Sequence, residues 1–170
     1  MNMQNKKITI RPVGEQDHDF VLKTNLDNVE YLSPMDKPRM LNLAAMTELF
    51  LVAEMDGQPA AFLMAFREGA EGYDSENYRW FSARYKQFLY IDRVAIIEPY
   101  RHQGIGKKLY EAVFDHARKI DVPSVTCEVD TIPYNEVSLN FHKVMGFHEV
   151  GTQYVKFNNV TVSMQEAAVR

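Results

Sequence analysis

Cysteine is nearly absent from this sequence of 170 residues: Cys127 stands alone, so no disulfide can form within the chain. A lone cysteine favours a reducing compartment. No apolar run approaches the roughly 20 residues that a membrane span needs, and the N-terminal segment lacks the apolar core of a signal peptide. We therefore expect a cytoplasmic protein with no membrane partner.

A strong charge of one sign and metal-ligand patterns are absent as well. The formal net charge is -4, which offers no general attraction to nucleic-acid phosphates, so no nucleic-acid partner is expected. The 5 histidines show no metal-ligand spacing, so we expect no metal site. Repeats and linkers are missing too. A chain with 46% hydrophobic residues is then most simply one globular domain, residues 1–170.

Hydrophobic periodicity and turn residues predict alternating strands and helices. The clearest signal is a hairpin, in which the apolar runs Phe50–Met55 and Ala60–Arg67 flank the turn pair Asp56-Gly57. The run Phe88–Ile97 is apolar on both faces and is expected in the middle of a sheet. Further strands are expected at Ile8–Arg11, at Pro123–Val129 and twice within 148–165, and helices at Gln16–Asn28, Arg39–Thr47, 105–120 and Glu136–Met145. This order predicts a mixed α/β sheet with helices on its faces.

The stretch Pro99–Lys119, "PYRHQGIGKKLYEAVFDHARK", places two glycines at the start of an amphipathic helix. A P-loop would need a Ser or Thr after its Gly-Lys, and a dinucleotide fingerprint would need a third glycine where Leu109 stands. Both patterns fail, which argues against an ATP or NAD protein. Gly104 and Gly106 instead let a strand turn into a helix whose free N–H groups can hold a diphosphate. Basic neighbours that suit further phosphate charge are Arg101, His102, Lys107 and Lys108.

Two motifs give the chain a family resemblance. "RHQGIG" (Arg101–Gly106) matches the Arg/Gln-x-x-Gly-x-Gly/Ala motif with which the GNAT superfamily of N-acetyltransferases binds the pyrophosphate of acyl-CoA. "NEVSLNFHKVMGF" (Asn135–Phe147) resembles the family's Asn-x-x-Ala/Ser-x-x-Leu/Phe-Tyr-x-x-x-Gly-Phe segment. The element order fits as well, so the resemblance covers nearly the whole chain. It implies a mixed, mostly antiparallel central sheet of six to seven strands flanked by about four helices.

The resemblance also implies how the acyl donor, acetyl-CoA, would bind. Backbone N–H groups of residues 102–106 would hold the pyrophosphate, within an acyl-CoA loop at residues 96–107. The main chain around 94–97 would pair with the pantetheine arm like an added strand, and acetyl-CoA would lie between the strands 88–97 and 123–129. The implied binding residues are Val94, Ala95, Ile96, Arg101, His102, Gln103, Gly104, Ile105, Gly106, Lys107, Asn135 and Ser138.

Acetyl transfer to an amine needs a group that removes the amine's proton, because an alkylammonium resembles lysine, whose pKa is near ~10.4. In the strand "YIDRVAI", Tyr90 and Asp92 share one face. Related acetyltransferases often place the deprotonating group at these positions. We predict Asp92 as the general base, directly or through water, with Tyr90 nearby. The alternative is that Asp92 is a buried acid satisfied by hydrogen bonds and has no catalytic part.

His142 stands where the family usually has a tyrosine that donates a proton to the CoA sulfur. Asn135, Ser138 and His142 form one helical stripe, which the resemblance turns toward acetyl-CoA. A neutral imidazole can still hydrogen-bond the sulfur, but a helix histidine is often structural. Asn135 can likewise serve as the helix N-cap. The adjoining stripe is expected to face the core and comprises Val137, Phe141, Val144 and Met145.

The connection Glu68–Gln87 is long for a compact domain and carries five aromatic residues, with the only tryptophan, Trp80, among them. Long aromatic loops are often lids or binding loops, so residues 68–87 are a candidate acceptor loop. A short helix around Tyr78–Tyr85 that fills a core edge or makes a dimer contact explains the same residues. Both alternatives stay open.

The predicted function is transfer of the acetyl group of acetyl-CoA to a primary amine of a small molecule or a peptide, by direct attack. The departure at His142 keeps a second hypothesis open, an acyl-CoA-binding regulatory or interaction module without turnover. A homodimer is a further expectation, because dimers are frequent in the family.

Overall fold

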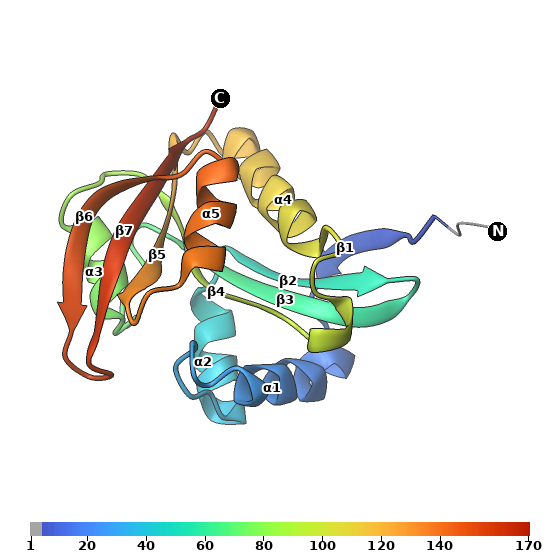
Figure 1. The fold of residues 1–170 in the computed structure, drawn as a ribbon. Coiled ribbons are helices and arrows are strands. Elements are labelled where there is room, and N and C mark those ends of the chain that lie inside the picture. Colours follow the sequence, from blue (N-terminus) through green and yellow to red (C-terminus); the bar gives the residue numbers. More distant parts are fainter. Residues whose placement is uncertain (1–4) are drawn as a thin grey trace. The chain divides into compact units, whose positions relative to one another are not determined.

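Seven β-strands, five α-helices and two short 3-10 helices make up the described part of the chain, residues 5–170 of the computed structural model (Figure 1). The first four residues of the predicted domain lie outside the described residues. In chain order the elements are β1 (Ile8–Pro12), η1 (Glu15–Asp17), α1 (His18–Asp27), α2 (Lys37–Met46), β2 (Leu49–Met55), β3 (Gln58–Arg67), α3 (Glu76–Ser82), β4 (Leu89–Ile96), η2 (Glu98–Tyr100), α4 (Ile105–Lys119), β5 (Ser124–Ile132), α5 (Glu136–Val144), β6 (His148–Val155) and β7 (Val160–Ala168).

The sheet has the strand order β1-β2-β3-β4-β5-β7-β6, which places β4 in the middle, as its two apolar faces predicted. β4 runs parallel to β5, with Leu89 beside Val125 and Tyr90 beside Thr126. The pairs β1–β2, β2–β3, β5–β7 and β6–β7 are antiparallel. The predicted mixed, mostly antiparallel sheet is therefore confirmed. The helix count exceeds the expected four by one, because α3 forms inside the connection 68–87.

The chain divides into two compact units. The first unit contains the residues up to 65 together with 93–112, and the second contains 66–92 together with 113–170. The strands β3 and β4 and the helix α4 contribute residues to both units.

In the first unit, the hairpin of β2 and β3 forms where the sequence predicted it. Asp56 and Gly57 both adopt left-handed backbone conformations, with φ of 51° and 82°. Two successive positive φ values define the turn that matches the twist of a two-residue hairpin. Helices α1 and α2 lie side by side next to the strands β1 to β3 (Figure 1).

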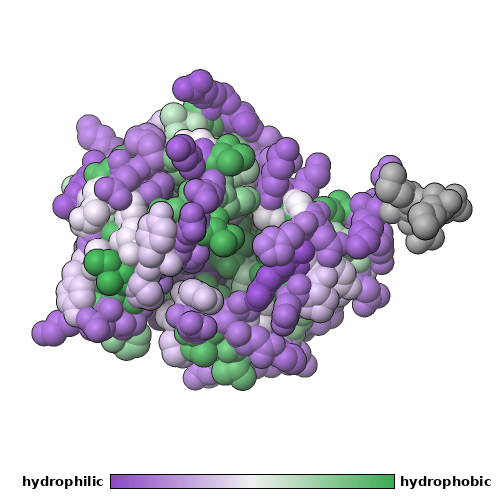
Figure 2. Space-filling view, viewed as in Figure 1, coloured by the Kyte–Doolittle hydropathy of each residue, from purple (hydrophilic) through white to green (hydrophobic). Residues whose placement is uncertain are grey.

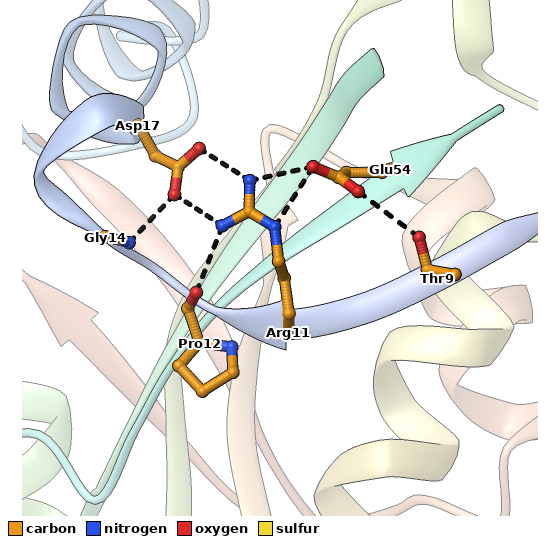
Figure 3. Close-up of polar contacts among 6 residues, drawn as sticks. All are labelled: Thr9, Arg11, Pro12, Gly14, Asp17 and Glu54. Atoms are coloured by element: carbon orange, nitrogen blue, oxygen red, sulfur yellow. Dashed lines mark hydrogen bonds and ion pairs between the residues drawn. The ribbon is translucent and has the colours of Figure 1, made fainter. Parts of the chain in front are cut away.

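An ion-pair cluster connects β1, η1 and β2 of the first unit (Figure 3). The guanidinium of Arg11 donates to both carboxylate oxygens of Asp17, at 2.7 and 2.9 Å, and to Glu54 at 2.8 and 3.0 Å. The N–H of Gly14 donates to Asp17 as well, at 2.8 Å. The hydrogen bonds from Arg11 hold the pKa of the buried Asp17 carboxyl below its ordinary 3.8. The bidentate geometry fixes η1 against the sheet and thereby orients the start of α1.

The core of the second unit contains an aromatic cluster that the connection 68–87 helps to build. Its rings belong to Phe66, Tyr73, Tyr78, Phe81, Phe88 and Tyr90, all 4% exposed or less. Ser75 caps the N-terminus of α3 by accepting from the Tyr78 N–H, which orders the segment. The prediction of a short helix whose aromatic side chains fill the core is therefore confirmed, although the helix begins two residues earlier than expected.

Trp80 of α3 packs against the strand β6 at Gly151. A Cβ at position 151 would overlap the ring of Trp80, so glycine is required for this close approach. The guanidinium of Arg84 lies over the indole of Trp80, 3.8 Å from the ring centroid. Asn77 also reaches β6, where its side-chain oxygen accepts from Gln153 at 2.9 Å. The contacts at Gly151 and Gln153 hold α3 against β6.

Candidate active site

The predicted diphosphate turn lies in the first unit, between β4 and α4. His102 and Gly104 have left-handed backbones, with φ of 62° and 86°. The Lys108 N–H of α4 donates to the Gly104 carbonyl of this turn at 3.1 Å. The N–H groups that precede it at the start of the helix have no intrahelical acceptor. Such a turn at the positive end of a 15-residue helix is suited to bind a diphosphate.

Side chains of the turn hold its backbone in place. Arg101 donates from Nε to the Ile96 carbonyl at 3.0 Å and from a terminal nitrogen to Asn28 at 3.1 Å. The amide of Gln103 donates to the Pro99 carbonyl at 2.9 Å. Arg101 and Gln103, both predicted to contact the donor, thus stabilise the backbone of the turn through their side chains. Lys107 is exposed, and Ile105 is buried beneath the helix start.

The strand β4 alternates as predicted. Tyr90 is buried, and Asp92, Val94 and Ile96 on the same face are partly exposed, whereas Arg93 and Ala95 point to the buried side. Immediately beyond the strand, the Ile97 N–H donates to the Ala60 carbonyl of β3 at 2.9 Å. The exposed side of β4 thus carries the predicted base.

In the second unit, two hydrogen-bonded pairs join the residues around Asp92. The hydroxyl of Tyr73 donates to the Asp92 carboxylate. The hydroxyl of Tyr90 donates to Glu128 of β5 at 2.7 Å and not to Asp92. Tyr90 therefore does not bind the predicted base, and a second carboxylate, that of Glu128, is its partner. We call Tyr73, Tyr90, Asp92 and Glu128 the carboxylate cluster.

Glu128 is the member of this cluster that the sequence reasoning missed. Burial raises the pKa of its carboxyl to about 8, and the negative charges of Asp92 and Asp130 contribute. Burial also raises the pKa of the Tyr90 hydroxyl. The signal that could have found Glu128 is its place in "PSVTCEV", where it is the only charged residue of an otherwise uncharged predicted strand.

The helix α5 places the predicted stripe in the second unit. The side chain of Asn135 accepts from the Ser138 N–H at 3.2 Å. Asn135 is therefore the N-cap of α5, as its alternative structural role predicted. His142 is 5% exposed, and its Nδ1–H donates to the Ser138 carbonyl at 2.7 Å. Burial lowers the pKa of this imidazole below 6.5, so the neutral ring is favoured. These contacts favour a structural role, and the proton-donor role stays a prediction.

The expected core face of α5 is wrong for two of its four residues. Phe141 and Met145 are half-buried, but Val137 is 72% exposed and Val144 is 85% exposed. The ring of His142 is buried instead and contacts the rings of Phe141 and Phe147. Figure 2 accordingly shows hydrophobic surface along α5. A helix of nine residues offers two adjoining stripes, and the point where it docks decides which one is buried. The end of α5 determines this point, because the Phe147 N–H donates to the His142 carbonyl at 2.9 Å beyond Gly146, whose φ is 95°.

Among residues 5–170, no helix is long and apolar enough to cross a membrane, and no group of three or more His, Cys, Asp or Glu side chains is arranged to hold a metal ion.

The seven-stranded sheet, with a left-handed turn and a 15-residue helix after its central strand β4, is the α/β arrangement that the two motifs implied. The model of the acetyltransferase (GNAT) family matches residues 19–147. The chain belongs to this family, as its two motifs predicted.

Solved structures share the fold over nearly the full length. Ard1 from Thermoplasma volcanium superposes with a TM-score of 0.76 at 19% identity, covering 96% of this chain and 98% of that one. Naa50 of Arabidopsis thaliana, in complex with the bisubstrate analogue CoA-Ac-MVNAL, has a TM-score of 0.71 at 18% identity, covering 94% of this chain and 97% of that one.

A curated relative is similar over a shorter stretch. The L-ornithine N5-acetyltransferase NATA1 of Arabidopsis thaliana is 41% identical over 70 residues, which are 41% of this chain and 29% of that protein. The matched stretch thus spans less than a third of the relative.

Proposed function

We propose that this protein transfers the acetyl group of acetyl-CoA to a primary amine of a small molecule or a peptide, by direct attack of the amine on the thioester. The observation that carries the proposal is the left-handed turn at 102–104, which opens α4 in a chain of the acetyltransferase family. A diphosphate is the ligand that such a helix start favours, and coenzyme A contains one.

The acyl donor would contact the turn through main-chain donors. The N–H groups of 102–106 would hold the pyrophosphate, while Lys107 supplies positive charge at the exposed side. Arg101 and Gln103 support this role by keeping the turn in shape. The contacts of Val94–Ile96, Asn135 and Ser138 with the donor rest on the family resemblance.

The amine acceptor would be recognised by the carboxylate cluster. A primary ammonium carries a positive charge and three donors, which suit the carboxylates of Asp92 and Glu128, two residues that are partly exposed. Two similarities support an amine: one relative is an ornithine N5-acetyltransferase, and Naa50 binds a conjugate of CoA with a peptide. The sequence proposes Asp92 as the base, and Glu128 is a second carboxylate in the same cluster.

Three further properties are proposed from the sequence alone. They are a single domain over residues 1–170, a cytoplasmic location and a homodimeric state. The lone cysteine, Cys127, is buried in β5, which is consistent with a thiol that stays reduced.

The first experiment measures release of the CoA thiol from acetyl-CoA in the presence of pooled amines: amino acids, polyamines, aminoglycosides, arylalkylamines and short peptides. We expect release above background with one pool. In parallel, Gly104→Ala should weaken acetyl-CoA binding, because φ of 86° strains any residue with a Cβ. Gly57→Ala introduces the same kind of strain in the β2–β3 turn and should leave binding unchanged.

The outcomes separate the two hypotheses. Saturable acetyl-CoA binding without release in any pool would favour the acyl-CoA-binding module. Equal binding by wild type and Gly104→Ala would contradict the role of the turn.

A further inference from the structure

The carboxylate cluster holds two acidic side chains with different surroundings. Tyr90 of β4 lies beside Thr126 of β5 in the parallel register, so Asp92 and Glu128, each two residues further on, lie on the same face of the sheet. Both residues are partly exposed, whereas Tyr90, which lies beside Thr126, is fully buried. An amine that reaches this face therefore meets two carboxylates.

Glu128 is held rigidly by neutral donors. The Tyr90 hydroxyl donates to one carboxylate oxygen at 2.7 Å, and the side-chain amide of Asn77 donates as well. The orientation of that amide is fixed, because its oxygen accepts from Gln153 at 2.9 Å. Both donors are uncharged, and none of the ion pairs among residues 5–170 involves Glu128. A rigid carboxylate without a cationic partner is free to receive a proton.

Asp92 differs from Glu128 in its place and partner. It receives the hydroxyl of Tyr73, whose ring is stacked on Phe66 at a centroid distance of 4.1 Å. The partly exposed Asp92 thus extends from the aromatic cluster as a fixed negative charge. Such a charge can hold an ammonium group without taking its proton.

We propose that Glu128, and not Asp92, accepts the proton of the acceptor ammonium, while Asp92 together with Tyr73 binds that ammonium. This inference rests on the proposed function. Glu128 takes one proton and leaves a neutral amine, whose nitrogen then forms the C–N bond as the C–S bond of the thioester breaks. The second proton leaves the nitrogen and goes to the departing thiolate. The products are the amide and CoA thiol, and the proton on Glu128 returns to solvent.

The basicity of Glu128 supports this division of roles. Burial, with the charges of Asp92 and Asp130, raises the pKa of its carboxyl to about 8, even though the hydrogen bonds from Tyr90 and Asn77 lower it. The carboxylate of Glu128 is therefore a much stronger base than an ordinary glutamate, whose pKa is about 4.3. Its pKa is also closer to that of an alkylammonium, so less free energy is needed to move the proton.

The surroundings contain the groups that can modulate this titration. They are Tyr90 and Asp92 on β4, Cys127 and Asp130 on β5, and the uncharged Asn77 on α3. On β7, Met164 lies opposite Glu128 and Glu166 lies opposite Thr126. The carboxylate of Glu166 is occupied, because it accepts from Tyr85 at 2.8 Å and from Ser124 at 2.7 Å.

The test compares pH–rate profiles of wild type, Glu128→Gln, Asp92→Asn and Glu166→Gln with the best acceptor of the amine panel. For wild type we expect kcat/KM to rise with pH through about 8, because Glu128 must be ionised to accept a proton. Glu128→Gln should lose this limb and about 10²–10⁴-fold of the rate, with an unchanged KM for acetyl-CoA. Asp92→Asn should raise KM for the amine and keep the rising limb of the pH profile. This limb should shift to lower pH, because losing the negative charge of Asp92 lowers the pKa of Glu128. Glu166→Gln, a matched carboxylate that also accepts from a tyrosine, should behave as wild type.

A second acceptor keeps the test decisive if Glu128→Gln is less stable. A fluorinated analogue of the same amine has a more acidic ammonium and needs less help to lose its proton, so the defect of Glu128→Gln should shrink at least tenfold. A defect of equal size with both acceptors would overturn the proposal. It is also overturned if Asp92→Asn, rather than Glu128→Gln, abolishes the limb. Absence of acetyl transfer by wild type to any amine would overturn the proposed function itself, whereas an active wild type with an equally active Glu128→Gln overturns only this inference.

Discussion

The imidazole of His142 lies between two aromatic rings, with centroid distances of 5.3 Å to Phe141 and 5.2 Å to Phe147. Its Nδ1–H is directed to the carbonyl one turn earlier in α5. The family resemblance predicts a proton donor here, but a buried ring with a lowered pKa holds its proton weakly. For His142, the position in the motif therefore predicts a proton donor, whereas the buried environment of the ring favours a structural role.

The burial of His142 predicts a pH dependence of stability. Below about pH 6.5 the unfolded chain takes up a proton that the folded chain does not, so the free energy of unfolding should fall by at most about 1.4 kcal/mol per pH unit. This contribution of His142 is fully present above this pH. In urea titrations from pH 4.5 to 8, wild type should lose stability below about pH 6.5 relative to His142→Asn, which keeps a donor but does not titrate. Parallel curves for the two proteins would contradict the assignment.

The element α3 shows how a segment without regular periodicity becomes ordered. Its sequence allowed both a lid and a core helix, because aromatic residues suit either. The structure buries Tyr78 and Phe81 and uses the Ser75 cap, so the segment is part of the core. Tyr73, ahead of the helix, still reaches Asp92. The element thus connects the core to the carboxylate cluster.

The contact between α3 and β6 yields a prediction at the same scale. Gly151→Ala places a methyl group against the rigid indole of Trp80 and should lower the free energy of unfolding by about 1–3 kcal/mol. In a Trp80→Ala background the same change should cost much less, because the obstructing ring is gone. Chemical denaturation of the four proteins gives the coupling energy. Additive effects would mean that Trp80 does not occupy the space beside residue 151.

At the scale of the whole molecule, the groups with raised pKa values predict its alkaline behaviour. Burial favours the neutral forms of Glu128, Cys127, Tyr90 and Tyr85, and it raises the pKa of Tyr85 to about 12. As pH rises, the unfolded chain loses each proton first, so stability declines. For Glu128 the decline begins near the ordinary carboxyl value of 4.5 and ends near about 8.

Guanidinium denaturation at pH 5, 7 and 9 measures this decline. Wild type should become less stable across the series, and Glu128→Gln should remove much of the loss between pH 5 and 8, because its amide does not titrate. The Glu166→Gln control should retain the decline. Equal slopes in wild type and Glu128→Gln would show that Glu128 is not the group responsible.

The sequence by itself determined the features that depend on neighbouring residues. The Asp56-Gly57 turn, the glycine turn before α4, the Asn135 cap and the Gly146 helix end follow from local backbone preferences that a few residues settle. The motif pair at Arg101–Gly106 and Asn135–Phe147 was sufficient to recognise the family. Strand β4 was placed centrally because both of its faces are apolar.

Only the tertiary structure decided which side chains meet. Tyr90 and Glu128 are 38 positions apart, and Tyr73 and Asp92 are 19 apart, so their pairing depends on strand register and on the docking of the α3 segment. The buried stripe of α5 was mispredicted for the same reason, since two adjoining stripes satisfy one periodicity. Local propensity acts over a few residues, whereas burial, register and the pKa of Glu128 arise from contacts between distant segments.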